Sequence, residues 1–318
     1  MRVALIGGGS WGCALARLIL KKGHLLRWWV HAEDIARNLQ EKRQHPFLFP
    51  EVVFPEIPWV GTSIQQALEE VDACVLALPA RHIEAVLGGL PELPGFWISC
   101  TKGLVLGALI QRPSQYLRAK GAEVAVLSGP SHAEEVIQDR PTWVAFATSK
   151  PELYEVGETL FGQPTFRLLP TPFLNALEWV GILKNLYAIL LGVVSTWGEN
   201  ARAALAAVVL AEMQEVLRAL VPEESPPFLS PGWAGDVLVT AFSMYSRNQR
   251  FGQLLGQGYA PQAALHKVGM VVEGYYAAQG LQAWPRQSEF PLLAAVLQVL
   301  AGQRPPTSLR EAVTLALR

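Results

Sequence analysis

Short apolar runs alternate with amphipathic segments through the first half of the chain. The runs end at glycine, proline or polar residues and cover residues 3–6, 25–30, 71–79, 96–100 and 124–128. Runs of this length predict buried strands, and the amphipathic segment 32–40 predicts a helix between two of them. Strands that are apolar on both faces belong to parallel sheets covered by helices. The pattern therefore predicts a doubly wound α/β sheet of the Rossmann type.

Longer helical segments replace these runs in the second half. From about Pro172 onward, apolar positions recur at helical spacing over residues 177–194, 201–220, 263–277 and 292–300. The proline- and serine-rich stretch 222–231 predicts an exposed loop. We therefore expect two domains: a dinucleotide-binding domain over residues 1–175, and an all-α substrate-binding and catalytic domain over residues 176–318.

A glycine turn connects the first predicted strand to the first predicted helix. Gly7, Gly9 and Gly12 stand at the three positions of the dinucleotide-binding fingerprint. The first glycine permits the tight turn, the second lets a pyrophosphate approach the backbone, and the third lets the helix pack on the strand. A purely structural turn would use the same glycines, but the correct strand and helix on either side favour a dinucleotide.

The position that contacts the adenosine ribose lies roughly twenty residues beyond the glycines. His31 and Ala32 stand there, where NAD-specific proteins usually carry a carboxylate, and Glu33 and Asp34 look like acids of a first helical turn. Without a carboxylate a 2′-phosphate is not repelled, and no arginine is obviously placed to bind one. Both NADPH and NADH remain candidates.

Two polar segments follow predicted strands. Thr101–Gly103 and Gly129–His132 each come at the carboxyl end of an apolar run, and ligands of doubly wound sheets bind at such ends. Ordinary strand-ending turns would have a similar composition, so each segment alone leaves both readings open.

Lys184 is a lone cation in a long apolar helical segment. At helical spacing its neighbours are apolar or glycine: Val180, Gly181, Ala188 and Leu191. A buried ammonium is costly unless it is paired or its pKa falls, and such a lysine can transfer protons near neutral pH. The alternative is a lysine whose head group reaches the surface from a core helix.

A polar cluster lies farther along the second half. Asp236 and Thr240 share one face if their segment is helical. Ser246, Arg247 and Asn248 follow where a new helix could begin. Helix N-terminal amides with an arginine form a receptor for a phosphate dianion. An N-cap serine beside solvated arginines is the structural alternative.

Composition narrows the class of protein. Of 318 residues, 51% are apolar and 17% charged, and the net charge is −1. A balance this close to neutral argues against a nucleic-acid partner. No apolar run reaches the roughly 18 residues of a membrane span, and no secretory signal pattern opens the chain. The three cysteines match no metal-ligand spacing, so we expect no metal and a reducing, cytoplasmic location.

Taken together, these segments resemble the bacterial-type NAD(P)-dependent sn-glycerol-3-phosphate dehydrogenases, from residue 2 to about residue 280. The motifs that carry the resemblance are Gly7–Gly12, Thr101–Leu104, Gly129–Glu134, Gly181–Asn185, Leu210–Met213, Gly235–Asp236, Ser246–Asn248 and Val272–Gly274. Their order and spacing make the match more specific than the glycine fingerprint alone.

The resemblance implies an oxidoreductase that acts on a CH–OH group. The family reduces dihydroxyacetone phosphate to sn-glycerol 3-phosphate, a backbone precursor of phospholipids, with NADPH or NADH. Lys184 is implied to be the catalytic acid and base, and Lys102 to contact substrate and nicotinamide. Besides the two lysines, the implied substrate-binding residues are Gly129, Ser131, Asn185, Asp236, Thr240, Ser246, Arg247 and Asn248. The implied cofactor contacts are Gly7, Gly9, Ser10, Trp11, Gly12, His31, Lys102, Ala133, Arg247 and Glu273.

The chain departs from the family pattern at several positions. His132, Ala32, Phe173, Ala201 and the segment 207–209 replace the usual residues. None of these changes removes a proton-transfer or phosphate-binding group, but Ala32 leaves the cofactor preference open.

Two other functions are compatible with parts of the pattern. A ketopantoate or β-hydroxyacid dehydrogenase would act on a carboxylate and would not need the cluster at residues 246–248. A dinucleotide sensor without turnover would not need both Lys102 and Lys184. For any of the three we expect a small-molecule ligand, and the apolar helices of the second half lead us to expect a homodimer.

Overall fold

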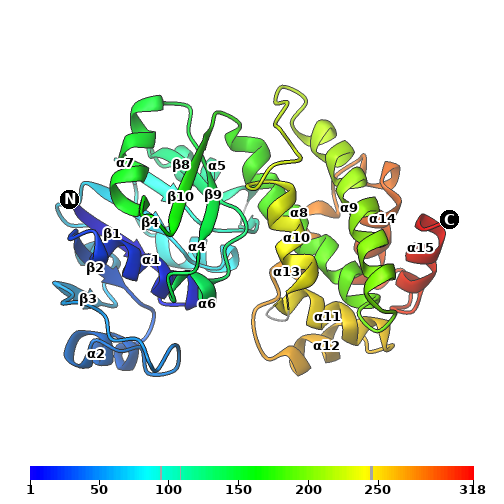
Figure 1. The fold of residues 1–318 in the computed structure, drawn as a ribbon, viewed down its shortest axis with the longest axis horizontal. Helices are drawn as coiled ribbons and strands as arrows, with labels where there is room; N and C mark the ends of the chain where they lie inside the picture. The colour runs from blue at the N-terminus through cyan, green and yellow to red at the C-terminus, as the bar shows by residue number, and fades with distance from the viewer. Residues whose placement is uncertain (94, 108, 244–245) are drawn as a thin grey trace. The chain divides into compact units, whose positions relative to one another are not determined.

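The computed structural model describes residues 1–93, 95–107, 109–243 and 246–318 (Figure 1). The chain divides into two compact units. Unit 1 comprises Met1–Thr101 and Gln111–Leu174, and unit 2 comprises Lys102–Ile110 and Asn175–Arg318. The predicted first domain, residues 1–175, includes residues 102–110, whereas in the structure this segment packs with the helices of unit 2.

Unit 1 is built on an eight-stranded sheet (Figure 1). In spatial order the strands are β10 (Phe166–Thr171), β9 (Thr142–Ala147), β8 (Glu123–Ser128), β5 (Phe96–Ser99), β4 (Ala73–Leu76), β1 (Arg2–Ile6), β2 (Leu25–Trp29) and β3 (Trp59–Gly61). Neighbouring strands are parallel, except that β9 runs antiparallel to β8. The predicted α/β class is confirmed, and β3, β9 and β10 are strands that the apolar pattern had not indicated.

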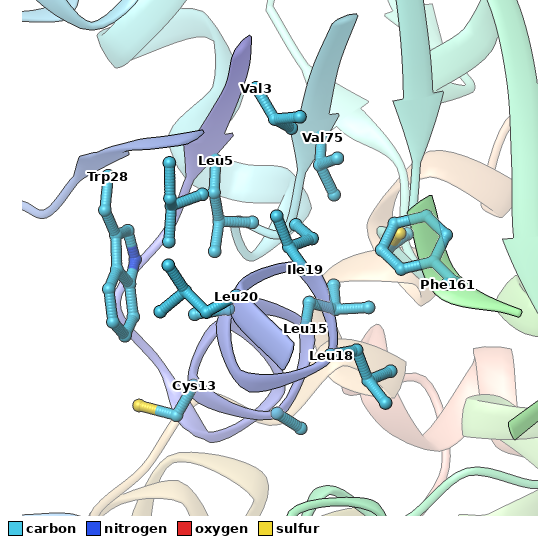
Figure 2. Packing of buried hydrophobic residues seen from close by; sticks show 14 of the residues in the cluster. Val3, Leu5, Cys13, Leu15, Leu18, Ile19, Leu20, Trp28, Val75 and Phe161 are labelled. Carbon is cyan, nitrogen blue, oxygen red and sulfur yellow. The ribbon is translucent and has the colours of Figure 1, made fainter. Parts of the chain in front are cut away.

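Helices pack on this sheet, and apolar side chains fill the space between. The helices are α1 (Ser10–Lys21), α2 (Glu33–Lys42), α3 (Ile64–Ala67), α4 (Ile83–Leu87), α5 (Pro113–Ala119), α6 (Ala133–Val136) and α7 (Pro151–Phe161), with a 3₁₀ turn at Ala80–His82. Figure 2 shows Val3 and Leu5 of β1 beside Leu15 and Ile19 of α1. Ile6 is equally buried, and alternation turns it toward the other face, so helices must cover the sheet on both sides.

Unit 2 consists of helices and one small hairpin. Its helices are α8 (Leu174–Val193), α9 (Glu199–Leu220), α10 (Ala234–Phe242), α11 (Arg247–Gly256), α12 (Pro261–Val268), α13 (Glu273–Leu281), α14 (Pro291–Leu300) and α15 (Ser308–Ala316), with a 3₁₀ turn at Gln287–Glu289. The two-residue strands β6 (Val105–Leu106) and β7 (Ile110–Gln111) form the hairpin, whose last residue, Gln111, belongs to unit 1. The single helix predicted over 263–277 is wrong, because Gly269 ends α12 with a left-handed backbone at φ +67°.

Helix α8 forms the centre of unit 2. By length and composition it could cross a membrane, but 89% of its most apolar window is buried inside the protein, as in the core helix of a globular domain. Its backbone contacts that of α11 directly. A Cβ atom at Gly192 would overlap the carbonyl of Gln249, and one at Gly252 would overlap the carbonyl of Ile189. The glycines are therefore required by the close crossing of the two helices.

Candidate active site

One buried carboxylate in unit 2 holds two ammonium groups. Asp236 lies on α10, and its side chain is 0% exposed. Lys184 of α8 donates to Oδ1 of Asp236, and Lys102 donates to Oδ2 over 2.8 Å. The side chain of Lys184 is 11% exposed and that of Lys102 is 21% exposed. The head group of Lys184 therefore stays inside the protein, paired with a carboxylate, and does not reach the surface.

The charges of these three residues change their pKa values. Burial lowers the pKa of Lys184 to about 8; Asp236 opposes this shift and the ammonium of Lys102 adds to it. Burial alone would raise the pKa of Asp236, but attraction to the two ammonium groups outweighs it and leaves the pKa below its ordinary value. Asp236 thus stays ionised while Lys184 can gain or lose a proton in the mildly alkaline range.

Thr240 completes the polar contacts of Lys184. Its hydroxyl lies 3.2 Å from Nζ of Lys184, and it donates to the carbonyl of Asp236 over 2.8 Å, one helical turn earlier. The predicted shared face of Asp236 and Thr240 is therefore present on α10. The amide of Gln249 on α11 donates to the carbonyl of Thr240, which ties α10 to the next helix.

Lys102 is fixed to unit 2 by its backbone as well as by its side chain. The amide of Asn185 donates to the carbonyl of Lys102 over 3.2 Å. Farther along the same segment, Leu104 and Ile110 pack against α13 so closely that a Cβ atom at Gly280 would overlap Leu104. Contacts with α8, α10 and α13 therefore set the position of this lysine.

A chain of side-chain amides joins Lys102 to the start of α11. Asn248 donates to Oδ1 of Asn185 over 3.0 Å, and its own Oδ1 accepts from the backbone N–H of Gly274 over 2.9 Å. The remaining donor of Asn185 is directed to the carbonyl of Gly181. The structure thus brings both predicted asparagines together, and their amide groups bind protein atoms.

Ser246 and Arg247 stand at the N-terminus of α11. The hydroxyl of Ser246 accepts from the backbone N–H of Gln249 over 3.3 Å and so caps the helix. Arg247 is the first residue of the helix, and its side chain is exposed. The alternative predicted for Ser246, an N-cap serine, is therefore confirmed. The free amides of a helix N-terminus and a guanidinium nonetheless remain available to an anion.

In unit 1, the three fingerprint glycines occupy three different environments. Gly7 has φ +133°, and a Cβ atom there would lie 2.5 Å from the carbonyl of Ala77. A Cβ atom at Gly12 would overlap the carbonyl of Gly7, so this glycine lets α1 pack on the turn. At Gly9 an added Cβ would meet no atom within 4 Å. Nothing in the fold itself requires glycine at position 9, and the open space suits an approaching pyrophosphate.

The other predicted residues of unit 1 follow its strands. Ser10 and Trp11 begin α1, where backbone amides are free of helical partners. His31 is an exposed residue just beyond β2, and Ala133 begins α6 after β8.

Gly129 and Ser131 lie in the turn between β8 and α6. Gly129 has φ +152°, and Ser131 donates to its carbonyl over 3.1 Å. The last predicted residue, Glu273, lies in unit 2 as the first residue of α13.

Sequence reasoning missed His45. This side chain is 4% exposed and binds the carbonyl of Gly8 in the glycine turn. A lone histidine outside any motif gives no pattern to detect. The only signal was its place in a proline-rich loop after the second predicted helix.

The arrangement in unit 2 suits a substrate that becomes negatively charged. Two ammonium groups share one carboxylate in a poorly solvated place. These groups stabilise an oxyanion where it forms, and Lys184 has a proton to give it. Among the described residues no group of three or more His, Cys, Asp or Glu side chains could hold a metal ion.

Comparisons with known proteins match both units. Residues 2–154 match a family model described as the N-terminus of NAD-dependent glycerol-3-phosphate dehydrogenase, and residues 174–311 match the model of its C-terminus. A glycerol-3-phosphate dehydrogenase [NAD(P)+] from Thermus thermophilus is 36% identical over 305 residues, which cover 94% of this chain and 93% of that protein. The enzyme of the same name from Fusobacterium nucleatum is 34% identical over 310 residues, 94% and 92% of the two chains.

Solved structures give the same result. A 2.1 Å crystal structure of glycerol-3-phosphate dehydrogenase from Coxiella burnetii superposes with a TM-score of 0.88 at 28% identity, covering 100% of this chain and 98% of that one. A ketopantoate reductase from Ralstonia eutropha reaches a TM-score of 0.51 at 12% identity, a likeness of fold alone.

Proposed function

The chain belongs to the NAD-dependent glycerol-3-phosphate dehydrogenase family, and on that premise we propose that Lys184, Lys102 and Asp236 form its reaction centre. The enzyme reduces dihydroxyacetone phosphate to sn-glycerol 3-phosphate with NADPH or NADH, reversibly, and the product supplies the backbone of phospholipids. The observation that carries the proposed centre is the buried carboxylate of Asp236 between two ammonium groups.

Lys184 transfers the proton in this proposal. When hydride reaches C2 of the ketone, the electron pair of the C=O bond moves to oxygen, and Nζ of Lys184 donates a proton to that oxygen. In the reverse direction the neutral amine removes the proton from the C2 hydroxyl. The pKa of Lys184, which burial lowers to about 8, permits both directions.

Lys102 and Asp236 support this transfer. The ammonium of Lys102 stabilises negative charge on the same oxygen as it develops. Asp236 binds both amines, and Thr240 limits the rotation of Lys184. Lysines held in this way lose little entropy at the transition state.

The remaining predicted residues hold the substrate's phosphate. Arg247 and the N-terminal amides of α11 supply positive charge, and the hydroxyl of Ser246 lies at the same helix end. Asn185 and Asn248 fix the helices that carry these groups. On unit 1, Gly129 and Ser131 add backbone and hydroxyl groups to the same ligand. Binding energy from the phosphate orients the ketone, which lies at the other end of the molecule.

The cofactor residues belong mainly to the turn of unit 1. The open space at Gly9 and the free amides at the start of α1 fit a dinucleotide pyrophosphate. Ser10, Trp11, Gly12, His31 and Ala133 are proposed as further contacts there, and Lys102, Arg247 and Glu273 as contacts supplied by unit 2. The bound dinucleotide supplies hydride to the ketone and accepts it from the alcohol.

We also propose a homodimer in the cytoplasm. Leu238 and Phe242 lie one turn apart on α10 and are 39% and 50% exposed, an apolar stripe that a second copy could cover. Cys13, Cys74 and Cys100 are all buried and free of disulfide bonds, which is usual in a reducing compartment.

One assay tests the proposed reaction against its rivals. The absorbance of NADPH or NADH is followed with dihydroxyacetone phosphate, with ketopantoate, or with no substrate. We expect rapid oxidation only with the triose phosphate. Faster consumption of ketopantoate would overturn the proposed substrate, and tight NADPH binding with no turnover of either compound would favour a sensor.

A further inference from the structure

His45 connects the glycine turn to the loop that follows α2. Its Nε2 atom lies 3.0 Å from the carbonyl oxygen of Gly8. Its Nδ1 atom lies 3.2 Å from the backbone nitrogen of Phe47 and 3.1 Å from that of Leu48. One ring therefore bridges two segments that are far apart in the sequence.

The partners of the ring determine its protonation. The backbone N–H groups of Phe47 and Leu48 can only donate, so Nδ1 must carry a free lone pair. The carbonyl of Gly8 can only accept, so the proton must be on Nε2. His45 is thus neutral in this arrangement. A second proton, on Nδ1, would face two N–H groups and break the contacts with the loop.

The contact with Gly8 also orients the peptide that follows it. The peptide bond between Gly8 and Gly9 is trans, so its C=O and N–H point in opposite directions. Because His45 holds the carbonyl, the N–H of Gly9 points away from the ring, at the residue where an added Cβ would meet nothing.

The neighbouring carbonyls of the turn are held as well. The indole of Trp28, which is fully buried, donates to the carbonyl of Gly7 over 2.8 Å. The carbonyl of Gly9 accepts from the backbone N–H of Cys13 over 2.9 Å. With His45 on Gly8, all three glycine carbonyls are engaged by protein donors, and anion-repelling oxygens are kept out of the open space.

We propose that His45 is a positioning residue for the dinucleotide: its neutral ring, fixed by the loop at Nδ1, holds the carbonyl of Gly8 so that the amide of Gly9 is available to the pyrophosphate. A proton on Nδ1 repels the two N–H groups of the loop, so the ring loses its anchor, no longer holds the carbonyl in this orientation, and cofactor binding weakens. This inference rests on the proposed binding of the pyrophosphate at the turn.

The surroundings of His45 set the range of this response. Burial lowers the pKa of His45 below its ordinary value, the contact with Gly8 opposes the shift, and His31 and Asp34 are the charged groups that act on the ring. His31 lowers the pKa further and Asp34 raises it. Cofactor affinity is therefore expected to be constant near neutral pH and to fall on the acid side of the ordinary histidine range.

Two variants separate the two halves of the contact. In His45→Asn, the side-chain oxygen reaches the place of Nδ1 and still accepts from the loop, but the side chain is too short for Gly8. In His45→Gln, the side-chain nitrogen reaches the place of Nε2 and still donates to Gly8, but it does not titrate in this range. Both variants change only His45, which is not part of the proposed reaction centre in unit 2.

The measurement is equilibrium binding of ADP-ribose by titration calorimetry between about pH 5 and pH 8. ADP-ribose keeps the pyrophosphate, lacks the nicotinamide and is stable in acid. We expect His45→Asn to raise the Kd about tenfold at pH 8, the usual effect of losing one buried hydrogen bond. We expect the melting temperature to stay near that of the wild type. The Kd of the wild type should rise toward pH 5, and that of His45→Gln should stay constant.

The outcomes distinguish this inference from the site on which it rests. Gly9→Ala fills the open space and should weaken ADP-ribose binding by at least tenfold. If Gly9→Ala binds normally, the proposed pyrophosphate site is wrong. If Gly9→Ala is weak but His45→Asn binds like the wild type, or if the wild type and His45→Gln respond alike to acid, the role of His45 is overturned.

Discussion

At the scale of single residues, the decisive feature is a buried carboxylate that two ammonium groups share. Asp236 is one carboxylate serving two lysines, and it is more deeply buried than either of them. Two ammonium groups held in this way can stabilise a group that becomes negative nearby, as a ketone does when it accepts hydride.

The first prediction at this scale concerns Lys184. Lys184→Ala should lower kcat at least about a hundredfold, because a positioned proton donor contributes that much or more. The Kd for NADPH should stay within about twofold, because the proposed proton donor is not among the proposed cofactor contacts. Steady-state kinetics and a fluorescence titration measure the two quantities. The control is Lys267→Ala, an exposed lysine on α12, and a near-normal rate in Lys184→Ala would remove Lys184 from the mechanism.

The second prediction is the pH dependence of the two directions. Reduction needs protonated Lys184 and oxidation needs the neutral amine. Because the pKa of this group is about 8, kcat for reduction should fall as pH rises through about 8, and kcat for oxidation should rise over the same range. Parallel profiles in the two directions would show that another group transfers the proton.

The third prediction concerns Arg247. Arg247→Ala should raise KM for dihydroxyacetone phosphate about tenfold or more, because a charged hydrogen bond to the phosphate contributes about 1.5–3 kcal/mol. Arg250→Ala is the matched control, since Arg250 is exposed on the same helix three residues later. Equal KM values in the two variants would place the phosphate elsewhere.

At the scale of elements, α8 is organised by its faces. Lys184 and Asn185 are consecutive, yet Lys184 contacts α10 and Asn185 contacts Asn248 of α11. Gly192 lies two turns after Asn185 on the same face of α8, and there the backbone of α11 contacts α8. The axial position of α8 therefore fixes the reaction centre and the start of α11 together.

The fourth prediction tests this crossing. Gly252→Ala forces a methyl group into the carbonyl of Ile189. The cost should reach the upper part of the overpacking range, about 3 kcal/mol, and lower the melting temperature by about 5–10 °C. Calorimetry measures the shift. Gly89→Ala, where an added Cβ meets nothing, is the control, and an equally stable Gly252→Ala would mean that the helices can separate at no cost.

The sequence predicted elements best where one signal was strong. The five apolar runs that form strands and the turn at Gly7–Gly12 were predicted because the length of each apolar run agreed with the glycine, proline or polar residues that bound it. β9 and β10 were missed; β9 joins the sheet antiparallel to β8, a partner that no local pattern specifies. The break between α12 and α13 was readable at Gly269, but continuous helical periodicity on either side concealed it.

At the scale of the whole molecule, the proposed contacts with the pyrophosphate lie in unit 1, and most of the proposed contacts with the substrate lie in unit 2. The fifth prediction is that hydrogen exchange will slow separately in each: ADP-ribose should protect residues 7–12, and glycerol 3-phosphate should protect residues 236–243. Mass spectrometry of peptic fragments resolves these regions. Helix α14 (Pro291–Leu300) serves as the reference that neither ligand should affect. Protection of residues 236–243 by ADP-ribose alone would contradict this division.

The site was predictable only in part from sequence. Family motifs supplied Lys184, Lys102 and Asp236 as candidates, but not that one carboxylate bridges both amines. That depends on the packing of α8, α10 and the segment after β5, which are separated by many residues. His45 was not predictable, because its role comes from a backbone carbonyl rather than from its neighbours in sequence.

The attachment of residues 102–110 to the helical unit has a practical consequence for protein engineering. A chimaera that borrows the nucleotide-binding unit of another dehydrogenase should be spliced after Thr101, before Gln111 and again after Leu174. A single crossover near residue 175 would import a foreign hairpin against Gly280. It would also replace the local surroundings of the amine at position 102, so the exchange would alter turnover even if the new cofactor bound well.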